Sequence, residues 1–461
     1  MSPHRAAALV AALGLALLWA GTEGSLSGWN AGAVGNSGND AANASLAFTH
    51  TYPNGSCAIT ARGSGTAACA ASPLPTATVT AGGVSAADAI RNEGTLSAAG
   101  LVSDLRATAC GPVKLVDTKT AADPMLPRYG TAFRQSDPWG SSGAVTLSAG
   151  AYAADVVATN TATLLGSSYT VGVWFKVASG YASGGGLIAL AASAVDGTSA
   201  ASSPMLWMDA AGKIRFRVTG TLGTSSSGVS VASYNDGSWH LAVLSVAATL
   251  VSTPTLYVDN AAGVTGLGLA ALTGGNAYWH LGWADFTGVS GPGSAYLAGS
   301  LAGAFVEDTS MSSATRSSLF TAASASAYST AVLALASIDH LWMADDTGTT
   351  TYAGTLPVIG ATSPCTMVDI AWSTTTPSGT VAAAGTKLSA FANGTFHTVT
   401  APGPGATQTS TITLTRDATW NAYIAGLRLY LPLEHRIQAA PAGGPWTRTF
   451  SWADASTVAI A

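Results

Sequence analysis

Short runs of β-branched and aromatic residues recur along this chain, and each is bounded by glycine, serine, asparagine or proline. The clearest run is KIRFRV, from Lys213 to Val218, in which three apolar residues alternate with three basic ones. Successive side chains of a strand point to opposite faces, so this pattern predicts a half-buried antiparallel strand. A helix would scatter the three apolar residues around its surface. The recurrence of such runs predicts an all-β chain.

The length of 461 residues predicts two to four structural units, because a single hydrophobic core stops growing well below that size. A proline-bearing stretch at 123–140 favours turns and places a boundary near residue 145. We therefore expect an N-terminal β-rich domain at 25–145, a central sandwich at 146–330 and a C-terminal β-rich region at 331–461. The C-terminal region could be a third unit or could add strands to the central one.

Residues 1–24 have the pattern of an export signal. His4 and Arg5 precede an apolar run from Ala6 to Gly21, which is shorter than the roughly twenty residues that cross a bilayer as a helix. The pattern predicts a secreted, extracellular protein that could stay associated with the cell surface, with no membrane span in the mature chain. Retention of the segment as an anchor is the alternative.

Four cysteines in an exported chain predict two disulfides, for which three pairings exist. Cys57 and Cys69 are near neighbours in one glycine-rich stretch, so we pair them with each other. Cys110 and Cys365 are then left as the second pair. No Cys or His spacing typical of a zinc site is present.

The charge balance argues against nucleic acid as a partner. Lysine and arginine together number 18 against 23 acidic residues, which gives a formal net charge of -5. Such a chain has no cationic field that would attract a phosphate backbone.

The residues needed for two common hydrolytic mechanisms are missing, so we expect no enzyme. Glucanases of sandwich fold place two glutamates on one strand, two positions either side of an aspartate, but Glu23, Glu93, Glu307 and Glu434 lie far apart in this chain. The Gly-x-Ser-x-Gly motif of a serine hydrolase is also absent.

Four segments resemble, in order, the recurrent motifs of the laminin G-like, concanavalin A-like jelly-roll family. They are SYTVGVWFKV at 168–177, NDGSWHLAVLSV at 235–246, TLYVDN at 255–260 and the segment 296–320. The resemblance implies a concanavalin A-like jelly-roll sandwich of two stacked antiparallel sheets, flanked here by smaller β-sandwich regions. It also implies a family that mostly binds glycans or proteins, sometimes through calcium.

The chain departs from the family pattern at two places. Asn260 stands where glycine is usual, and the usual acidic residue near Ala304 to Val306 moves to Glu307 and Asp308. This shift puts a transferred metal ligand in doubt.

The N-terminal part is similar to secreted surface proteins of the TasA and camelysin type. The similarity rests on GTEGSLSGWNAGAV, which starts at Gly21, and on RNEGTLSAAG at 91–100. The composition, poor in lysine and rich in alanine and glycine, would suit a high-GC Gram-positive bacterium.

The segment AYWHLGWADF at 277–286 is the best candidate for a ligand site. Aromatic rings beside a carboxylate suit a sugar, so Trp279, Trp283 and Asp285 are predicted to bind glycan. The alternative is that alternate members of the segment pack in the core. For calcium, the only cofactor that the sequence suggests, hard oxygen ligands near strand ends come from Asp209, Asp236, Asp259 and Asp285, each of which could instead be a turn residue.

These observations favour a secreted, non-catalytic cell-surface protein whose jelly roll binds a glycan or a surface protein. The alternative is a structural cell-surface or fibre component that has no small ligand.

Overall fold

The computed structural model describes residues 48–52, 55–59, 77–79, 83–94, 98–107, 111–160, 168–196, 204–219, 225–247, 253–261, 263–266, 276–344, 352, 368–376, 379–382, 386–387, 397–399, 403–416, 426–441 and 448–460. The signal segment 1–24 lies outside the described residues. So do Cys69, Cys110, Cys365 and the side chain of Cys57, so the two disulfides stay predictions.

The chain forms two compact units, and each consists mainly of strands. One unit contains residues 1–110, 364–420 and 431–459, and the other, which we call the central unit, contains residues 111–363, 421–430 and 460–461. The described helices are α2 (Ser313–Phe320) and α3 (Ala325–Leu333). The prediction of an all-β fold is confirmed.

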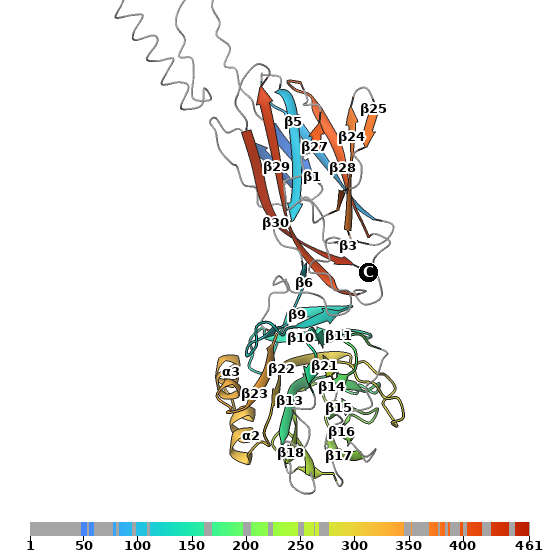
Figure 1. Ribbon diagram of the computed structural model, residues 1–461, viewed down its shortest axis with the longest axis vertical. Helices are drawn as coiled ribbons and strands as arrows, with labels where there is room; N and C mark the ends of the chain where they lie inside the picture. Colours follow the sequence, from blue (N-terminus) through green and yellow to red (C-terminus); the bar gives the residue numbers. More distant parts are fainter. Residues whose placement is uncertain are drawn as a thin grey trace, which may run out of the picture. The chain divides into compact units, whose positions relative to one another are not determined.

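Two antiparallel sheets build the central unit (Figure 1). The nine-stranded sheet has the order β20 (Val264–Thr265), β19 (Thr253–Val258), β18 (His240–Ala247), β13 (Tyr169–Lys176), β22 (Gly299–Glu307), β10 (Ala144–Leu147) and β9 (Thr131–Gln135), with β23 (Ile338–Met343) beside β22 and β7 (Val116–Asp117) beside β23. The eight-stranded sheet has the order β17 (Ser225–Ser233), β16 (Lys213–Thr219), β15 (Pro204–Met208), β14 (Gly185–Ala191), β21 (Asn276–Leu281), β11 (Tyr152–Asp155) and β8 (Met125–Arg128), with β12 (Thr159–Asn160) beside β21. In addition, β6 (Gly111–Pro112) pairs with Leu429 and Tyr430.

The four motif segments fall on four adjacent strands of the nine-stranded sheet. The segments 168–177, 235–246, 255–260 and 296–320 contain β13, β18, β19 and β22, whose order in the sheet is β19-β18-β13-β22. The last segment also contains α2, which follows β22. The resemblance therefore located one half of the sandwich correctly.

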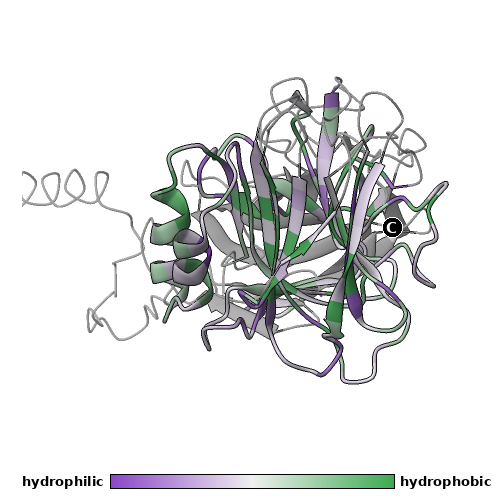
Figure 2. Ribbon diagram, turned by 90° about the horizontal axis from the view of Figure 1, so that it is seen from below, coloured by the Kyte–Doolittle hydropathy of each residue, from purple (hydrophilic) through white to green (hydrophobic). Residues whose placement is uncertain are grey.

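The core lies between the two sheets, as the strand pattern predicts. Along β16, Ile214, Phe216 and Val218 are each 0% exposed, whereas the intervening basic residues are half-buried. Figure 2 shows the same alternation of hydrophobic and hydrophilic residues along strands of the central unit. On the other face of the nine-stranded sheet, Leu319 and Tyr328 of the two helices pack against residues of β22 and β23.

The central unit is longer than the predicted 146–330. Strands β9 and β10 precede residue 146 and pair with each other and with β22, and β23 pairs with β22 beyond residue 330. Pro127, which we took as part of a boundary, lies in β8 at the end of the eight-stranded sheet. An edge strand tolerates proline because one of its sides needs no ladder donor.

The other unit joins strands from both flanks of the chain. Its seven-stranded sheet has the order β2 (Gly55–Ile59), β1 (Phe48–Tyr52), β4 (Val84–Asn92), β28 (Thr407–Arg416), β24 (Val368–Thr376) and β25 (Gly379–Ala382), with β26 (Thr386–Lys387) beside β24. Its second sheet contains β27 (His397–Val399), β5 (Ala98–Ala107), β29 (Arg428–Pro441), β30 (Arg448–Ile460) and β3 (Ala77–Val79). Because β4 pairs with β28 and β5 with β29, the regions predicted at 25–145 and 331–461 share their sheets.

The departure from the family pattern at Asn260 has a local explanation. Asn260 adopts a positive φ of 57°, a left-handed conformation that asparagine tolerates better than most residues other than glycine. Its side-chain oxygen accepts a hydrogen bond of 2.8 Å from Arg316 Nε in α2. The guanidinium of Arg316 in turn lies 3.5 Å from the ring centroid of Tyr257. Asparagine here links the turn after β19 to α2, which glycine could not do.

Candidate functional site

The tryptophans predicted to form a glycan-binding rim are buried. Trp279 is 0% exposed and Trp283 is 3% exposed. Trp279 points between the sheets, where its ring centroid lies 6.3 Å from that of Trp342. The prediction of an exposed rim is therefore wrong for both residues, and core packing is the correct alternative. Around β21 both faces of this sheet are covered, so both tryptophans are buried.

Two of the aspartates predicted to bind calcium contact a histidine instead. His240 Nδ1 lies 2.6 Å from Asp259 Oδ2, and His240 Nε2 lies 3.0 Å from Asp236 Oδ1. The second oxygen of Asp259 accepts the amide of Leu241 at 3.0 Å. Burial lowers the pKa of His240, but the hydrogen bonds and charges of the two carboxylates outweigh it and hold this pKa above the usual value. Asp236 and Asp259 thus each form an ion pair with His240 when His240 is protonated.

The other two predicted calcium ligands close their own turns. Asp209 Oδ2 lies 2.6 Å from Arg215 Nε, and its Oδ1 accepts backbone amides. Asp285 Oδ1 accepts the amide and the hydroxyl of Thr287 at 2.9 and 2.8 Å. The carboxylates of these four aspartates do not lie close enough together to bind one metal ion. Among the described residues, one other group has ligand atoms at such distances. Calcium binding by these aspartates stays a prediction, and the structure gives each of them protein hydrogen-bond partners.

An aromatic group on the outer face of the eight-stranded sheet surrounds Asp196. We call it the tyrosine–aspartate cluster. Tyr152 in β11 and His280 in β21 point away from the core, because their neighbours Ala153 and Leu281 face it. The members of the cluster are Tyr129, Tyr152, Asp196, His280, Trp283 and Tyr296.

Hydrogen bonds fix Asp196 between two tyrosines. The Tyr152 hydroxyl donates to Asp196 Oδ1 at 3.2 Å, and the Tyr296 hydroxyl donates to Asp196 Oδ2. Burial raises the pKa of both phenols, and the adjacent carboxylate contributes to this shift. Both hydroxyls therefore stay protonated and remain donors at neutral pH. A carboxylate has about four lone-pair sites, so Asp196 can accept further hydrogen bonds from the hydroxyls of a ligand.

The floor of the cluster is tightly packed, and the Arg128 guanidinium lies 6.0 Å from the ring centroid of Tyr152. The His280 ring stacks on Tyr152 with centroids 5.7 Å apart and lies 4.8 Å from Trp283. Its Nε2 donates to the Ser193 carbonyl at 2.8 Å, and burial lowers its pKa to about 4. The imidazole is consequently uncharged at pH 7. Tyr152 and His280 are 0% exposed, whereas Tyr129 is 46% exposed, so a buried floor has an exposed aromatic rim.

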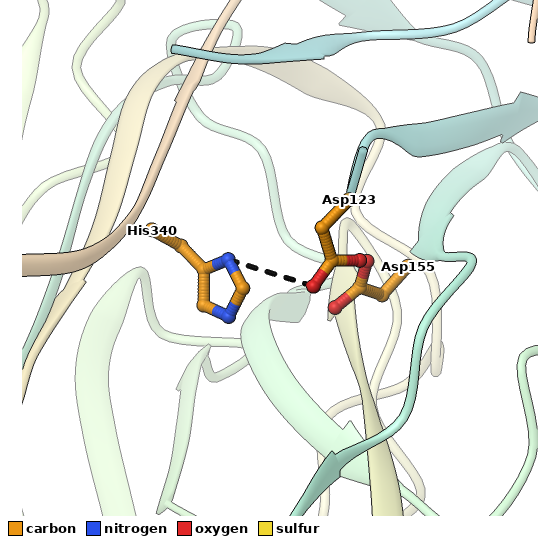
Figure 3. Close-up of side chains that lie close together, drawn as sticks. All are labelled: Asp123, Asp155 and His340. Atoms are coloured by element: carbon orange, nitrogen blue, oxygen red, sulfur yellow. Dashed lines mark ion pairs between the residues drawn. The ribbon is translucent and has the colours of Figure 1, made fainter. Parts of the chain in front are cut away.

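A separate carboxylate–histidine cluster lies between the two sheets. It consists of Asp117 in β7, Asp123 before β8, Asp155 at the end of β11 and His340 in β23. All four residues are less than a tenth exposed. Figure 3 shows the carboxyl groups of Asp123 and Asp155 side by side, facing the imidazole of His340. Ligand atoms of these three lie within 4.8 Å of one another, which is compatible with a bound metal ion.

His340 is the basic member of this cluster. Its Nδ1 lies 2.8 Å from Asp117 Oδ2 and 3.9 Å from Asp123 Oδ2, and its Nε2 lies 3.3 Å from Asp339 Oδ2. Burial lowers the pKa of His340, but these carboxylates raise it above the usual value. Burial, together with the adjacent Asp123, raises the pKa of Asp155 well above its usual range.

Neither cluster could be predicted from local patterns. The tyrosine–aspartate cluster combines residues from five places in the chain, and only His280 and Trp283 lay in the aromatic stretch at 277–286. In the carboxylate–histidine cluster, Asp117 and His340 are 223 positions apart. The sequence signal for the carboxylate–histidine cluster was the presence of Asp123, Asp155 and Asp339 beside strand-like runs.

Comparison with known proteins defines the central fold. Residues 150–315 match the family model Laminin_G_3, described as the concanavalin A-like lectin/glucanases superfamily. The central unit is concanavalin A-like. The concanavalin A-like unit contains strands outside the matched range, since β7 to β10 precede it and β23 follows it. A search of curated proteins finds no match.

Solved structures that match part of this chain include two neurotoxin binding domains and a pentraxin. The botulinum neurotoxin serotype D binding domain matches at 10% identity and TM-score 0.34, over 46% of this chain and 50% of that one. The binding domain of botulinum neurotoxin DC in complex with SialylT matches at 10% identity and TM-score 0.33, over 47% and 52%. A heptameric SAP-like pentraxin from Limulus polyphemus matches at 10% identity and TM-score 0.27, over 49% and 84%. The chain thus spans about half the length of the two neurotoxin domains.

None of the helices in the described ranges has the length and apolar character needed to cross a bilayer.

Proposed function

We propose that this chain is an exported, non-catalytic surface protein whose concanavalin A-like unit binds a glycan, free or carried on a surface protein, at the tyrosine–aspartate cluster. The observation that carries the proposal is the carboxylate of Asp196, which is fixed by two tyrosine hydroxyls beside the exposed ring of Tyr129.

The chemistry of the cluster matches that of a sugar. A pyranose offers CH groups, which pack on aromatic rings, and hydroxyls, which donate to carboxylates. The partly exposed rings of Tyr129 and Tyr296 would contact the CH face, and Asp196 would accept ligand hydroxyls. The floor of Tyr152, His280 and Trp283 keeps these groups in place before a ligand arrives, which lowers the entropy cost of binding.

The arrangement of acidic residues supports a non-catalytic role. Glu307 is 5% exposed and accepts the hydroxyl of Thr309 at 2.9 Å, and Glu93 pairs with Arg91 in the other unit. The close carboxyl pair Asp123 and Asp155 lies between the sheets, where a polymeric sugar has no access. A glycosidase needs two carboxyl groups that reach one glycosidic bond.

A glycan-array screen of the purified protein tests the proposal, followed by affinity measurements on any sugar that binds. We expect Asp196→Asn and Tyr129→Ala each to weaken binding about tenfold or more, which corresponds to about 1.4 kcal/mol. Val231→Ala is the matched control, because Val231 is 85% exposed on β17, at the opposite end of the same sheet. Asp285→Asn should also bind normally.

Two results would contradict the proposal. Unchanged affinity of Asp196→Asn and Tyr129→Ala would remove the cluster from the site. Failure to bind any glycan, together with concentration-dependent assembly of the protein alone, would favour a structural surface or fibre component.

A further inference from the structure

The carboxylate–histidine cluster carries more negative charge than its protein partners balance. The ion pairs of Asp117 and Asp123 go to His340, which also faces Asp339. In the described part of the chain, no lysine or arginine forms an ion pair with any of these carboxylates. One imidazole is thus shared by several carboxyl groups that are removed from water, and an additional positive charge would be stabilised there.

Asp155 supplies the second observation. It is 1% exposed, and its Oδ2 has no hydrogen-bond partner in the structure. Its Oδ1 accepts the amide of Val156, at 2.9 Å. Burial of a polar group without a partner costs free energy, so native proteins supply a water, a proton or a cation at such an oxygen. The surplus of carboxyl groups around this oxygen favours a cation. The free oxygen belongs to the carboxyl group that Figure 3 shows beside Asp123.

The donor set indicates which cation fits. It consists of two carboxylates and one imidazole nitrogen within 4.8 Å of one another. Calcium and magnesium take oxygen ligands, whereas imidazole together with carboxylate suits zinc and other divalent transition metals. The carboxylate of Asp339, 3.3 Å from His340 Nε2, has the position of the outer partner that orients a metal-binding histidine through its other nitrogen.

We propose that Asp123, Asp155 and His340 Nδ1 bind one divalent transition-metal ion of the zinc type. Binding displaces the proton that Nδ1 shares with Asp117, and this proton leaves to solvent while a nitrogen–metal bond forms. Asp117, 2.8 Å from the same nitrogen, then lies next to the ion.

The ion would cross-link the two sheets of the concanavalin A-like unit. Asp155 lies in β11 of the eight-stranded sheet, whereas Asp117 and His340 lie in β7 and β23 of the nine-stranded sheet. Its role is therefore structural, and its loss should reduce stability. Trp342 reports on the site, because its ring stacks on His340 with centroids 4.7 Å apart and an interplanar angle of 9°.

The test uses the full chain, stripped with a chelator and then titrated with ZnCl₂. We expect about one zinc per chain by elemental analysis and calorimetry, a change in tryptophan fluorescence, and a higher thermal midpoint with zinc than with chelator. Asp155→Asn should reduce zinc affinity about tenfold or more. Asp123→Asn is a second variant, in case the first fails to fold.

His240→Gln is the matched control, since His240 also lies between two carboxylates in the same unit. This variant should bind zinc like the wild type. The proposal is overturned if the wild type binds no zinc and its thermal midpoint is the same with zinc and with chelator. In that case a proton shared by Asp123 and Asp155 balances the charge of the site. It is equally overturned if His240→Gln, rather than Asp155→Asn, abolishes binding.

Discussion

Replacement of Trp279 tests whether this residue packs in the hydrophobic core, because the loss of a core tryptophan lowers the free energy of unfolding. The side chain is 0% exposed. A buried tryptophan removes roughly 200 Å² from water, which at about 25 cal/mol per Å² contributes about 5 kcal/mol. Its Nε1 has no hydrogen-bond partner in the structure, and an unsatisfied buried N–H costs about 1–3 kcal/mol. We therefore expect Trp279→Ala to lower the free energy of unfolding by about 2–4 kcal/mol.

Trp279→Phe separates the two contributions. Phenylalanine keeps much of the apolar area and removes the unsatisfied donor, so this variant should lose less than about 1.5 kcal/mol. Urea unfolding monitored by circular dichroism gives both values from the midpoint at constant m. Tyr129→Ala, at an exposed position, should change stability by about 0.5 kcal/mol or less. A Trp279→Ala change that small, or equal losses for the two Trp279 variants, would refute the reasoning.

Three further outcomes can be checked by the same unfolding assay. The pKa of His240 is raised above its unfolded value of about 6.5, so its contribution to stability should be complete below that pH and lost as the pH rises through the folded pKa; His240→Gln should remove this part of the pH dependence. Asn260→Ala should cost about 1–2 kcal/mol, because alanine resists a φ of 57° and loses the bond to Arg316, while Asn260→Gly should cost less; equal losses would contradict the account of the turn. Gly172→Ala should cost about 1–3 kcal/mol, because the added Cβ would collide with the ring of Phe305, and a neutral result would show that the ring can move.

Local patterns predicted the strands of the concanavalin A-like unit well. The alternation in β16 and the four motif segments depend on residues that are close in sequence, and the structure places them as expected. Long-range pairing was not accessible in this way. The residues of β4 carry no local pattern that identifies β28 as the paired strand. We therefore predicted separate N- and C-terminal regions, although these regions share two sheets.

Trp279 and Trp283 show why burial was misjudged at the predicted site. Trp279 and Trp283 are four positions apart, so a continuous strand would place both on one face. However, β21 ends at Leu281 and Gly282 adopts a φ of 82°, and Trp283 packs in the outer cluster instead of the core between the sheets. Here the outer face of the eight-stranded sheet is also covered, by Tyr278, Ala295 and Tyr296 around Trp283. Sequence spacing distinguishes the two faces of a strand, but it does not show which face meets water.

Strand β11 explains how two polar sites arise in a chain with only 9% charged residues. Tyr152 points to the outer face, where it donates to Asp196, and Asp155 lies three positions later, so it points to the inner face. The inward aspartate is next to the last strand of the sheet, β8, where the loop before that strand brings Asp123 alongside. A carboxyl group in the middle of the sandwich would meet only apolar side chains. At the margin it meets His340 of the other sheet, so one strand contributes Tyr152 to the outer cluster and Asp155 to the cluster between the sheets.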